Sequence, residues 1–191
     1  FVSGSPSQRA WRVARHNGHP VVLQTWENKM AHTHPTMVAG DDLWADYVLT
    51  ARFTPETTKG RSGLSFRHHN DRCNYFFGVQ DGKAVLKLVK DEKAFHVPDE
   101  KILAERALQW KPGEELNVEI TLNGKRIAAK INGRFTLTAE DESFPHGRIA
   151  LVADGPTRFS QVRVTASAAE RDRVVAENAR IKAETQKIQA T

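Results

Sequence analysis

The sequence predicts an all-β fold in which two antiparallel sheets pack as a β-sandwich, followed by a C-terminal α-helical extension. Three observations support this prediction. Many short segments alternate apolar and polar residues or run apolar, and they are rich in β-branched and aromatic residues. Asn-Gly and Asp-Gly pairs stand between several of these segments. The last 25 residues contain neither Gly nor Pro.

The strand segments follow one another at short intervals. In segment 46–54, Tyr47, Leu49, Ala51 and Phe53 share one face, because successive side chains of a strand point to opposite sides. No stretch between the segments has the length and period of a crossover helix, so an antiparallel sandwich is favoured over βαβ units. The predicted strands are 21–25, 46–54, 63–69, 74–80, 84–90, 115–124, 126–133, 147–154 and 159–166.

Three turn pairs connect neighbouring strands. They are Asp81-Gly82, Asn123-Gly124 and Asn132-Gly133. A type I′ hairpin turn needs positive φ at both central residues, and these residue types tolerate it best. The pairs therefore predict tight hairpins.

The C-terminal segment has the composition of a solvated helix. Ser167 followed by Glu170 forms a capping box, and Arg180 and Glu184 can pair at i,i+4. Apolar residues recur every seven positions, but the complementary heptad positions are polar, so the apolar stripe is narrow for a coiled coil. We expect a sandwich domain over 1–166 and, over 167–191, a helical linker or the start of a following domain, with a dimerising helix as the alternative.

The composition bounds the partners. The chain has 191 residues, 39% hydrophobic and 27% charged, with a formal net charge of +5. No apolar run reaches the roughly 18 residues of a membrane span, and neither a dense basic tract nor a nucleic-acid motif occurs, so we expect no membrane and no nucleic-acid partner. A single cysteine, Cys73, excludes an internal disulfide. Because the chain begins at Phe1 and not at Met, we expect a processed or excised piece, and the export signal of a secreted or periplasmic protein could have been removed from it.

Several catalytic motifs are missing from the sequence. It has no Gly-x-Gly-x-x-Gly, no P-loop and no Gly-x-Ser-x-Gly nucleophile elbow. The Glu-x-Asp-x-x-Glu pattern that supplies the two carboxylates of jelly-roll glucanases is also missing. We therefore assign no catalytic residue from these motifs and expect no cofactor.

Two short clusters could hold a metal. Asp41, Asp42 and Asp46 stand in one turn and could bind a structural Ca²⁺ together with backbone carbonyls, although capping of the following strand explains them as well. His32 and His34 would share one face of a strand, but Pro35 follows at once, and surface histidines are the simpler interpretation.

A denser polar and aromatic set surrounds one turn. Leu64 and Phe66 of strand 63–69 point to the core, which puts Ser65, Arg67 and His69 on the other face. Aromatic rings stack on sugar rings, while Arg, Asn and His bind hydroxyl or carboxylate groups. The candidate ligand-binding residues are Arg67, His68, His69, Asn74, Tyr75 and Trp44.

The order of motifs resembles a known group. Residues 44–47 read W-x-D-Y, residues 62–67 S-G-x-x-F-R, residues 74–77 N-Y-x-F, residues 110–113 W-x-P-G and residues 147–151 G-x-I-A-L. Over roughly 10–166 this pattern is similar to the concanavalin A-like, laminin-G-like jelly rolls of bacterial carbohydrate-active proteins. The closest likeness is to the 3-keto-disaccharide hydrolase-like domains and the lectin-like modules of polysaccharide lyases and glycosidases.

The resemblance implies a jelly roll with a concave, glycan-facing sheet and Arg67 in its groove. It implies a non-catalytic, lectin-like carbohydrate-binding module of a larger secreted bacterial polysaccharide-degrading enzyme. Its partners would be a polysaccharide or oligosaccharide and a C-terminal catalytic domain. The net positive charge and an arginine in the groove favour an acidic sugar.

Two alternatives stay open. One is a glycoside hydrolase or polysaccharide lyase acting on a uronate-containing glycan, with His68 or His69 as base, Tyr75 as acid and Arg67 neutralising the carboxylate. The other is a structural domain that packs on a catalytic domain.

Overall fold

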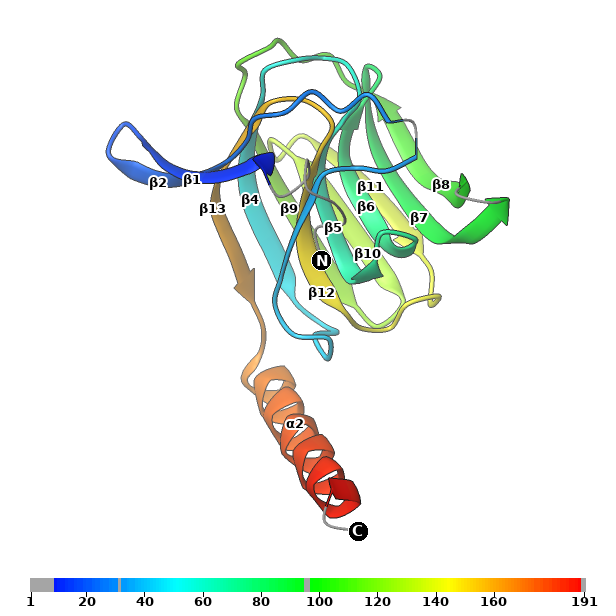
Figure 1. The fold of residues 1–191 in the computed structure, drawn as a ribbon. Coiled ribbons are helices and arrows are strands. Elements are labelled where there is room, and N and C mark those ends of the chain that lie inside the picture. Colours follow the sequence, from blue (N-terminus) through cyan, green and yellow to red (C-terminus); the bar gives the residue numbers. More distant parts are fainter. Residues whose placement is uncertain (1–8, 31, 95–96, 190–191) are drawn as a thin grey trace.

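The computed structural model describes residues 9–30, 32–94 and 97–189. In this part of the chain two antiparallel sheets face each other, and a single long helix leaves the end of the sandwich (Figure 1). The seven-stranded sheet has the order β1 (Trp11–His16), β2 (His19–Gln24), β13 (Thr157–Thr165), β4 (Val48–Pro55), β9 (Leu116–Asn123), β10 (Arg126–Ile131) and β11 (Phe135–Glu140). The six-stranded sheet has the order β3 (Thr36–Ala39), β12 (Arg148–Ala153), β5 (Arg61–Asn70), β6 (Cys73–Gln80), β7 (Lys83–Ala94) and β8 (Val97–Ala107). The predicted all-β sandwich is confirmed.

The core lies between the two sheets. Phe53 and Phe159 from the seven-stranded sheet and Leu64, Phe66 and Phe77 from the six-stranded sheet have no exposed side-chain surface. Each such side chain contributes roughly 1.5–3 kcal/mol through removal of apolar surface from water. The alternation of the sequence therefore places one face of every central strand in a common apolar layer.

The turn chemistry follows the predictions with one shift. Asp81 and Gly82 have φ of 49° and 76°, and Asn132 and Gly133 have φ of 52° and 62°. Asn123, however, is the last residue of β9, and it pairs with Arg126. The loop between them is Gly124-Lys125, with the positive φ at Gly124.

In the described part of the chain all nine predicted strand segments are present, together with four strands that were not predicted. These are β1, β3, β8 and β11. Strand β8 carries Ala, Glu, Lys and Leu, which favour helices in isolation. Its pairing with β7 over the length of the strand overrides that local preference.

The helix α2 spans Ala168–Gln189. The Ser167 Oγ atom accepts a hydrogen bond from the Glu170 backbone N–H at 3.1 Å, which forms the predicted N-cap. The Glu170 side chain does not complete the capping box, and it accepts hydrogen bonds from the backbone N–H groups of Ala45 and Asp46 at 3.0 and 3.3 Å. No residue of α2 is buried, so the helix is attached to the sandwich mainly through polar contacts near its start. Among the described residues, no helix is long and apolar enough to cross a bilayer.

Candidate functional site

The outer face of the six-stranded sheet, which points away from the core, carries an unusual set of buried polar side chains. The register pairs Ser65 with Phe76, Phe76 with Lys87, and Lys87 with Ile102, so these four side chains lie on that face. Phe76 is 1% exposed and Lys87 is 4% exposed, although both point away from the sandwich core. Neighbouring side chains therefore shield the central residues of this face from solvent.

A glycine pair forms the middle of this face. Gly63 on β5 is paired with Gly78 on β6. A Cβ atom at Gly78 would lie 2.2 Å from the Ser62 carbonyl oxygen and 2.9 Å from the Phe76 ring. The absence of a side chain at Gly78 lets β5 and β6 approach closely and lets the Phe76 ring pack against Gly78.

Two cations stand over the Phe76 ring. The Arg61 guanidinium carbon is 5.4 Å from the ring centroid, and the Lys87 Nζ atom is 5.7 Å from it. Such cation–π contacts stabilise partly desolvated charges. The ring is thereby covered by cations and offers no open stacking surface of its own.

Glu100 on β8 joins the two cations. Its Oε1 atom is 2.9 Å from Arg61 Nη2, and its Oε2 atom is 2.8 Å from Lys87 Nζ. Lys87 Nζ also donates to the Gln80 side-chain oxygen at 2.7 Å. The Glu100 side chain is 25% exposed, whereas Arg61 and Lys87 are 8% and 5% exposed, so the carboxylate is the accessible member of this Glu100 cluster.

Asp154 binds the segment between β2 and β3 and holds it next to the Glu100 cluster. The segment between β2 and β3 crosses from the seven-stranded to the six-stranded sheet (Figure 1). Within it, Asn28 Nδ2 and His34 Nδ1 lie 3.0 and 2.6 Å from Asp154 Oδ1. Asp154 Oδ2 accepts a hydrogen bond from the Arg61 backbone N–H at 3.0 Å. The crossing segment thus borders the Glu100 cluster.

The surrounding groups hold the carboxylates of Glu100 and Asp154 in the ionised form. Burial opposes ionisation of Glu100, but the charges of Arg61 and Lys87 outweigh it and lower the pKa of Glu100 to about 2. Burial also opposes ionisation of Asp154, and its pKa is lowered because His34, Asn28 and the Arg61 N–H bind the carboxylate. Burial and the nearby Arg61 lower the pKa of Lys87, with Glu100 acting in the opposite sense.

Beside the cluster, between β5 and the crossing segment, lies a hollow of about 20 Å³, bordered by His34, Arg61, His68 and Asn74 among others. This volume holds about one water molecule. The Arg61 Nε and His34 Nε2 atoms are buried without a hydrogen-bond partner among the described residues. The inner polar groups of this face therefore suit a bound water, and Glu100 is the polar group that stays accessible at its rim.

Arg67 does not lie on the outer face, which corrects the sequence-based prediction. In the pairing of β12 with β5, Ala150 is opposite Ser65 and Arg148 is opposite His68, so a β-bulge stands at residues 66–67. Arg67 has φ of 44° and is 1% exposed. The extra residue turns the Arg67 side chain inward, where a ligand cannot reach it in this structure.

Tyr75 also faces the core. It stacks on Phe66 with ring centroids 5.4 Å apart, and its hydroxyl donates to Asp141 Oδ1 at 2.5 Å. Burial and the hydrogen bond to Asp141 raise the pKa of Tyr75. A hydroxyl in this position cannot act as the acid of a sheet-surface reaction, because it is 0% exposed and already bonded.

The remaining residues of the predicted set do not form one site. His68 and Asn74 do lie together on the outer face of the six-stranded sheet, where His68 Nδ1 is 3.0 Å from Ser65 Oγ and burial lowers the pKa of His68 to about 4. His69 lies at the end of the sandwich, with its ring 5.6 Å from that of His146. The predicted His68, His69 and Tyr75 catalytic set is therefore not assembled.

Trp44 lies at the base of α2. Its ring is 6.2 Å from Tyr47 in an edge-to-face arrangement, and it borders a hollow shared with Val174. A Cβ atom at Gly40 would lie 2.4 Å from the Trp44 ring, so the indole is closely packed. Trp44 is remote in the fold from the Glu100 cluster.

The three acidic residues proposed for calcium bind different groups. Asp41 accepts hydrogen bonds from the Leu43 backbone N–H at 2.8 Å and from Asn178 at 2.9 Å. Asp42 pairs with Arg148 at 2.7 Å, and Asp46 accepts a hydrogen bond from the Gly124 N–H. In the part of the chain that the structure describes, no group of three His, Cys, Asp or Glu side chains could hold a metal ion. Calcium in this loop stays a prediction.

The sequence analysis did not identify the residues of the Glu100 cluster as site residues. Arg61, Lys87 and Glu100 come from three strands and are separated by 26 and 13 positions in the sequence. Lys87 stands in an otherwise apolar strand, and a buried lysine needs a partner, which is the one signal the sequence offered. The strand β8 that carries Glu100 was itself not predicted.

No family model matches the chain, and no curated protein sequence matches it. Solved structures do match. The carbohydrate binding module CBM66 from Bacillus subtilis superposes with a TM-score of 0.59 at 16% identity, over 82% of this chain and 91% of that one. The chain has the concanavalin A-like jelly-roll fold.

Longer solved proteins contain the same fold. The GH43 BlXynB protein from Bacillus licheniformis matches with a TM-score of 0.59 at 13% identity, over 85% of this chain and 36% of its own. The Aspergillus kawachii beta-fructofuranosidase complexed with glycerol matches with a TM-score of 0.51 at 14% identity, over 83% of this chain and 33% of its own. At these identities the likeness defines the fold, and the chain spans about a third of each of these two proteins.

Proposed function

We propose that this chain is a non-catalytic carbohydrate-binding module that binds a glycan on the outer face of the six-stranded sheet. The observation that carries the proposal is the Glu100 carboxylate, held at the rim of that face by Arg61 and Lys87. An ionised carboxylate accepts two or more hydrogen bonds, and vicinal sugar hydroxyls can donate them. The two cations fix its orientation before a sugar arrives.

The charge balance of the cluster favours an uncharged sugar. Two cations, Arg61 and Lys87, are offset by two carboxylates, Glu100 and Asp154, which lie 2.9 Å and 3.9 Å from Arg61 atoms. The most exposed member is a carboxylate, which would repel a uronate approaching it. A neutral glycan with free hydroxyl groups is therefore the better ligand for this face.

Catalysis at the same place is disfavoured by its protonation states. A glycosidase needs one carboxyl group that stays protonated as general acid, with a raised pKa. The pKa values of Glu100 and Asp154 are both lowered. Binding without bond cleavage is the function that these groups support.

The fold similarity to a protein named as a carbohydrate binding module supports the proposal. The similarity to the GH43 protein and the beta-fructofuranosidase supports a setting within a larger carbohydrate-active protein. We propose that the chain is part of a larger secreted bacterial protein that degrades polysaccharide through a catalytic domain beyond α2.

The proposal is tested by calorimetry with neutral polysaccharides and oligosaccharides, including fructans because one similar structure is a beta-fructofuranosidase. Glu100→Gln keeps the shape and removes the charge, and we expect its affinity to be about tenfold or more weaker, since a charge-assisted hydrogen bond contributes roughly 1.5–3 kcal/mol. Glu142→Gln removes an exposed carboxylate elsewhere and serves as the matched control. Equal affinity of the Glu100→Gln variant and the wild type would contradict the assigned site.

A further inference from the structure

One half of the seven-stranded sheet is basic and contains no acidic residue. The four adjacent strands β1, β2, β13 and β4 contain five arginines and neither Asp nor Glu. The arginines are Arg12, Arg15, Arg52, Arg158 and Arg163. A sheet surface normally mixes both signs of charge, so this half of the sheet differs from an ordinary protein surface.

The register shows which arginines point outward. Arg158 is paired with Leu23 and Thr54, and Leu23 is paired with Arg12. The neighbouring Phe159 is in the core, so Arg158 and its partners point away from it.

Two more arginines continue this surface. Arg52 is paired with Ser160 and Asn117, and Arg163 is paired with Thr50. Four arginines, Arg12, Arg52, Arg158 and Arg163, thus form a basic stripe on the outer face of the sheet.

Most of the stripe lacks compensating charge. Arg52 lies 3.4 Å from Glu115, in a pair whose side chains are both 43% exposed. Arg158 donates to the Thr54 hydroxyl at 3.3 Å. In the described part of the chain, Arg12, Arg158 and Arg163 form no ion pair. Their positive potential is therefore directed to solvent.

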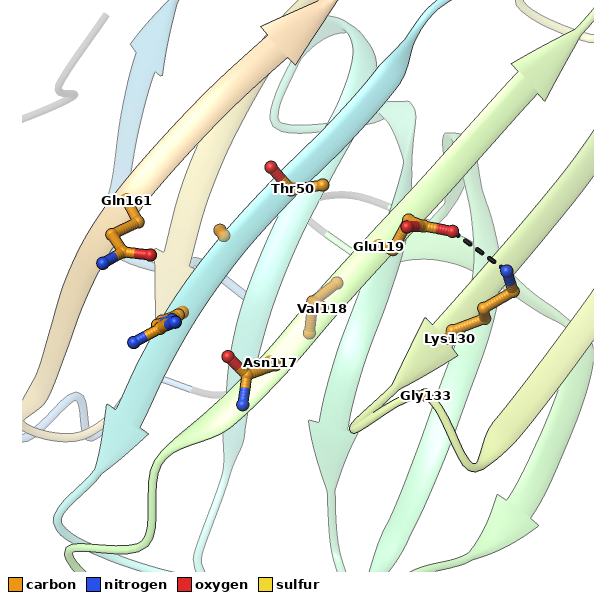
Figure 2. A pocket seen from close by; sticks show the side chains of 9 residues that line it. Thr50, Asn117, Val118, Glu119, Lys130, Gly133 and Gln161 are labelled. Atoms are coloured by element: carbon orange, nitrogen blue, oxygen red, sulfur yellow. Dashed lines mark hydrogen bonds and ion pairs between the residues drawn. The ribbon is translucent and has the colours of Figure 1, made fainter.

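A hollow of about 360 Å³ adjoins the stripe, and Figure 2 shows the side chains that line it. Asn117 on β9 and Gln161 on β13 lie on the two sides of β4, and Thr50 stands on β4 between those strands (Figure 2). Gln161 has φ of 51° in a bulge of β13. Glu119 and Lys130 close the far side as an ion pair at 3.0 Å. The hollow thus offers amide and hydroxyl groups beside cations.

We propose that this outer face of the seven-stranded sheet is a second binding surface, which takes a linear acidic polysaccharide. The arginines bind carboxylates along the polymer, because a guanidinium matches a carboxylate in two parallel hydrogen bonds. The amides in the hollow bind the sugar hydroxyls. The four strands carry no Trp, Tyr or Phe on this face, so nucleic-acid bases would find no aromatic surface for stacking.

The surface is independent of the Glu100 cluster, which lies on the other sheet. The proposal therefore does not rest on the function proposed above. It assigns acidic polymers and neutral glycans to opposite faces of the sandwich.

The test measures binding of the 191-residue chain to polygalacturonate at low salt by affinity electrophoresis, with fully methyl-esterified polygalacturonate as the uncharged polymer of the same backbone. We expect binding to the acidic polymer alone, and a loss of binding as salt rises, because exposed charges are screened. Failure of the wild type to bind polygalacturonate, or equal binding of the esterified polymer, would overturn the proposal.

Variants locate the surface. The double variant Arg12→Gln/Arg163→Gln changes two exposed side chains and should bind polygalacturonate roughly tenfold more weakly, since two exposed charge pairs with the polymer are lost. Lys90→Gln/Lys182→Gln removes the same charge from exposed sites elsewhere and should bind as the wild type does. An equal loss in this control, or a loss in Glu100→Gln, contradicts the assigned face. Equally strong binding of duplex DNA contradicts the assignment to a polysaccharide.

Discussion

The Arg67 guanidinium donates a hydrogen bond to the Gly124 carbonyl oxygen over 2.7 Å, so a side chain that starts on the six-stranded sheet ends on a turn of the seven-stranded sheet. It also donates to the carbonyl oxygens of Ala45 and Phe144, both at 3.2 Å. Three loops at one end of the sandwich thus share a single buried cation. Arg67 is a structural cross-connection between the sheets.

The first prediction concerns this connection. Arg67→Met leaves the three carbonyl groups without their donor in a buried place, and we expect a loss of about 3–5 kcal/mol in the free energy of unfolding. Urea denaturation measures it. Arg134→Met changes an exposed arginine and should cost less than about 0.5 kcal/mol. A loss of similar size in both variants would contradict the structural role of Arg67.

The second prediction concerns the glycine pair under the Phe76 ring. Gly78→Ala brings a methyl group to 2.2 Å from the Ser62 carbonyl oxygen, which is backbone and cannot turn aside. We expect roughly 2–4 kcal/mol of destabilisation from separation of β5 and β6. Gly18→Ala meets no atom within 4 Å but has φ of 80°, so it should cost only about 1 kcal/mol. Thermal unfolding of the two variants compares them, and the opposite order would refute the close approach.

The third prediction is a pH dependence. The folded protein holds the pKa of Glu100 at about 2, below its ordinary value of 4.5, so the stabilisation is complete above pH 4.5 and disappears as the pH falls toward 2. Because the carboxylate is a quarter exposed, solvent screens part of the effect, and we expect about 1–2 kcal/mol.

Glu100→Gln should therefore reduce the loss of stability between pH 5 and pH 2.5, measured by urea denaturation at each pH. Asp154 also has a lowered pKa, so some pH dependence should persist in the variant. Glu142→Gln serves as the control with the wild-type slope. An unchanged slope in Glu100→Gln would show that the cluster is not ionised as described.

The fourth prediction concerns α2. Because Glu170 joins the Arg173 guanidinium to the N–H groups of Ala45 and Asp46, its pKa is lowered to about 2 and it holds the first turn on the sandwich. Glu170→Ala should widen the distribution of distances between spin labels at Cys73 and an introduced Gln186→Cys, while the free energy of unfolding changes by about 1 kcal/mol or less, since the helix buries no residue. Glu184→Ala, farther along the helix, should leave the distribution narrow. Equal distributions in the two variants would contradict the docking role.

Local sequence signals predicted much of the fold. Alternation in 46–54 identified a strand because each side chain there faces either the core or solvent. The pairs Asp81-Gly82 and Asn132-Gly133 identified turns because few residues adopt positive φ. Strand β8 was not predicted, since its residues favour helix until β7 supplies hydrogen-bond partners along its length.

The candidate site was much less predictable. Alternation predicted that Arg67 shares the outer face with Ser65, but a single β-bulge turns the Arg67 side chain inward. The residue types in this segment do not identify such a bulge. The same bulge brings His68 to the outer face, where strict alternation had placed His69, and His68 lies there beside Asn74. The sequence did not indicate a role for Glu100, because that role depends on Arg61 and Lys87 from two other strands.

The sequence by itself determined the all-β class, most strands, the turn positions and the helix with its Ser167 cap, because each of these depends on interactions among neighbours in the chain. The tertiary structure alone decided which charges meet. Arg61, Lys87 and Glu100 become a cluster, and Arg12, Arg158 and Arg163 become a stripe, only when the sheet order β3-β12-β5-β6-β7-β8 and its seven-stranded counterpart bring distant segments side by side. In the buried cluster each charge has its partner within hydrogen-bond distance, because a charged group removed from water needs one, whereas the stripe keeps its positive charge facing solvent.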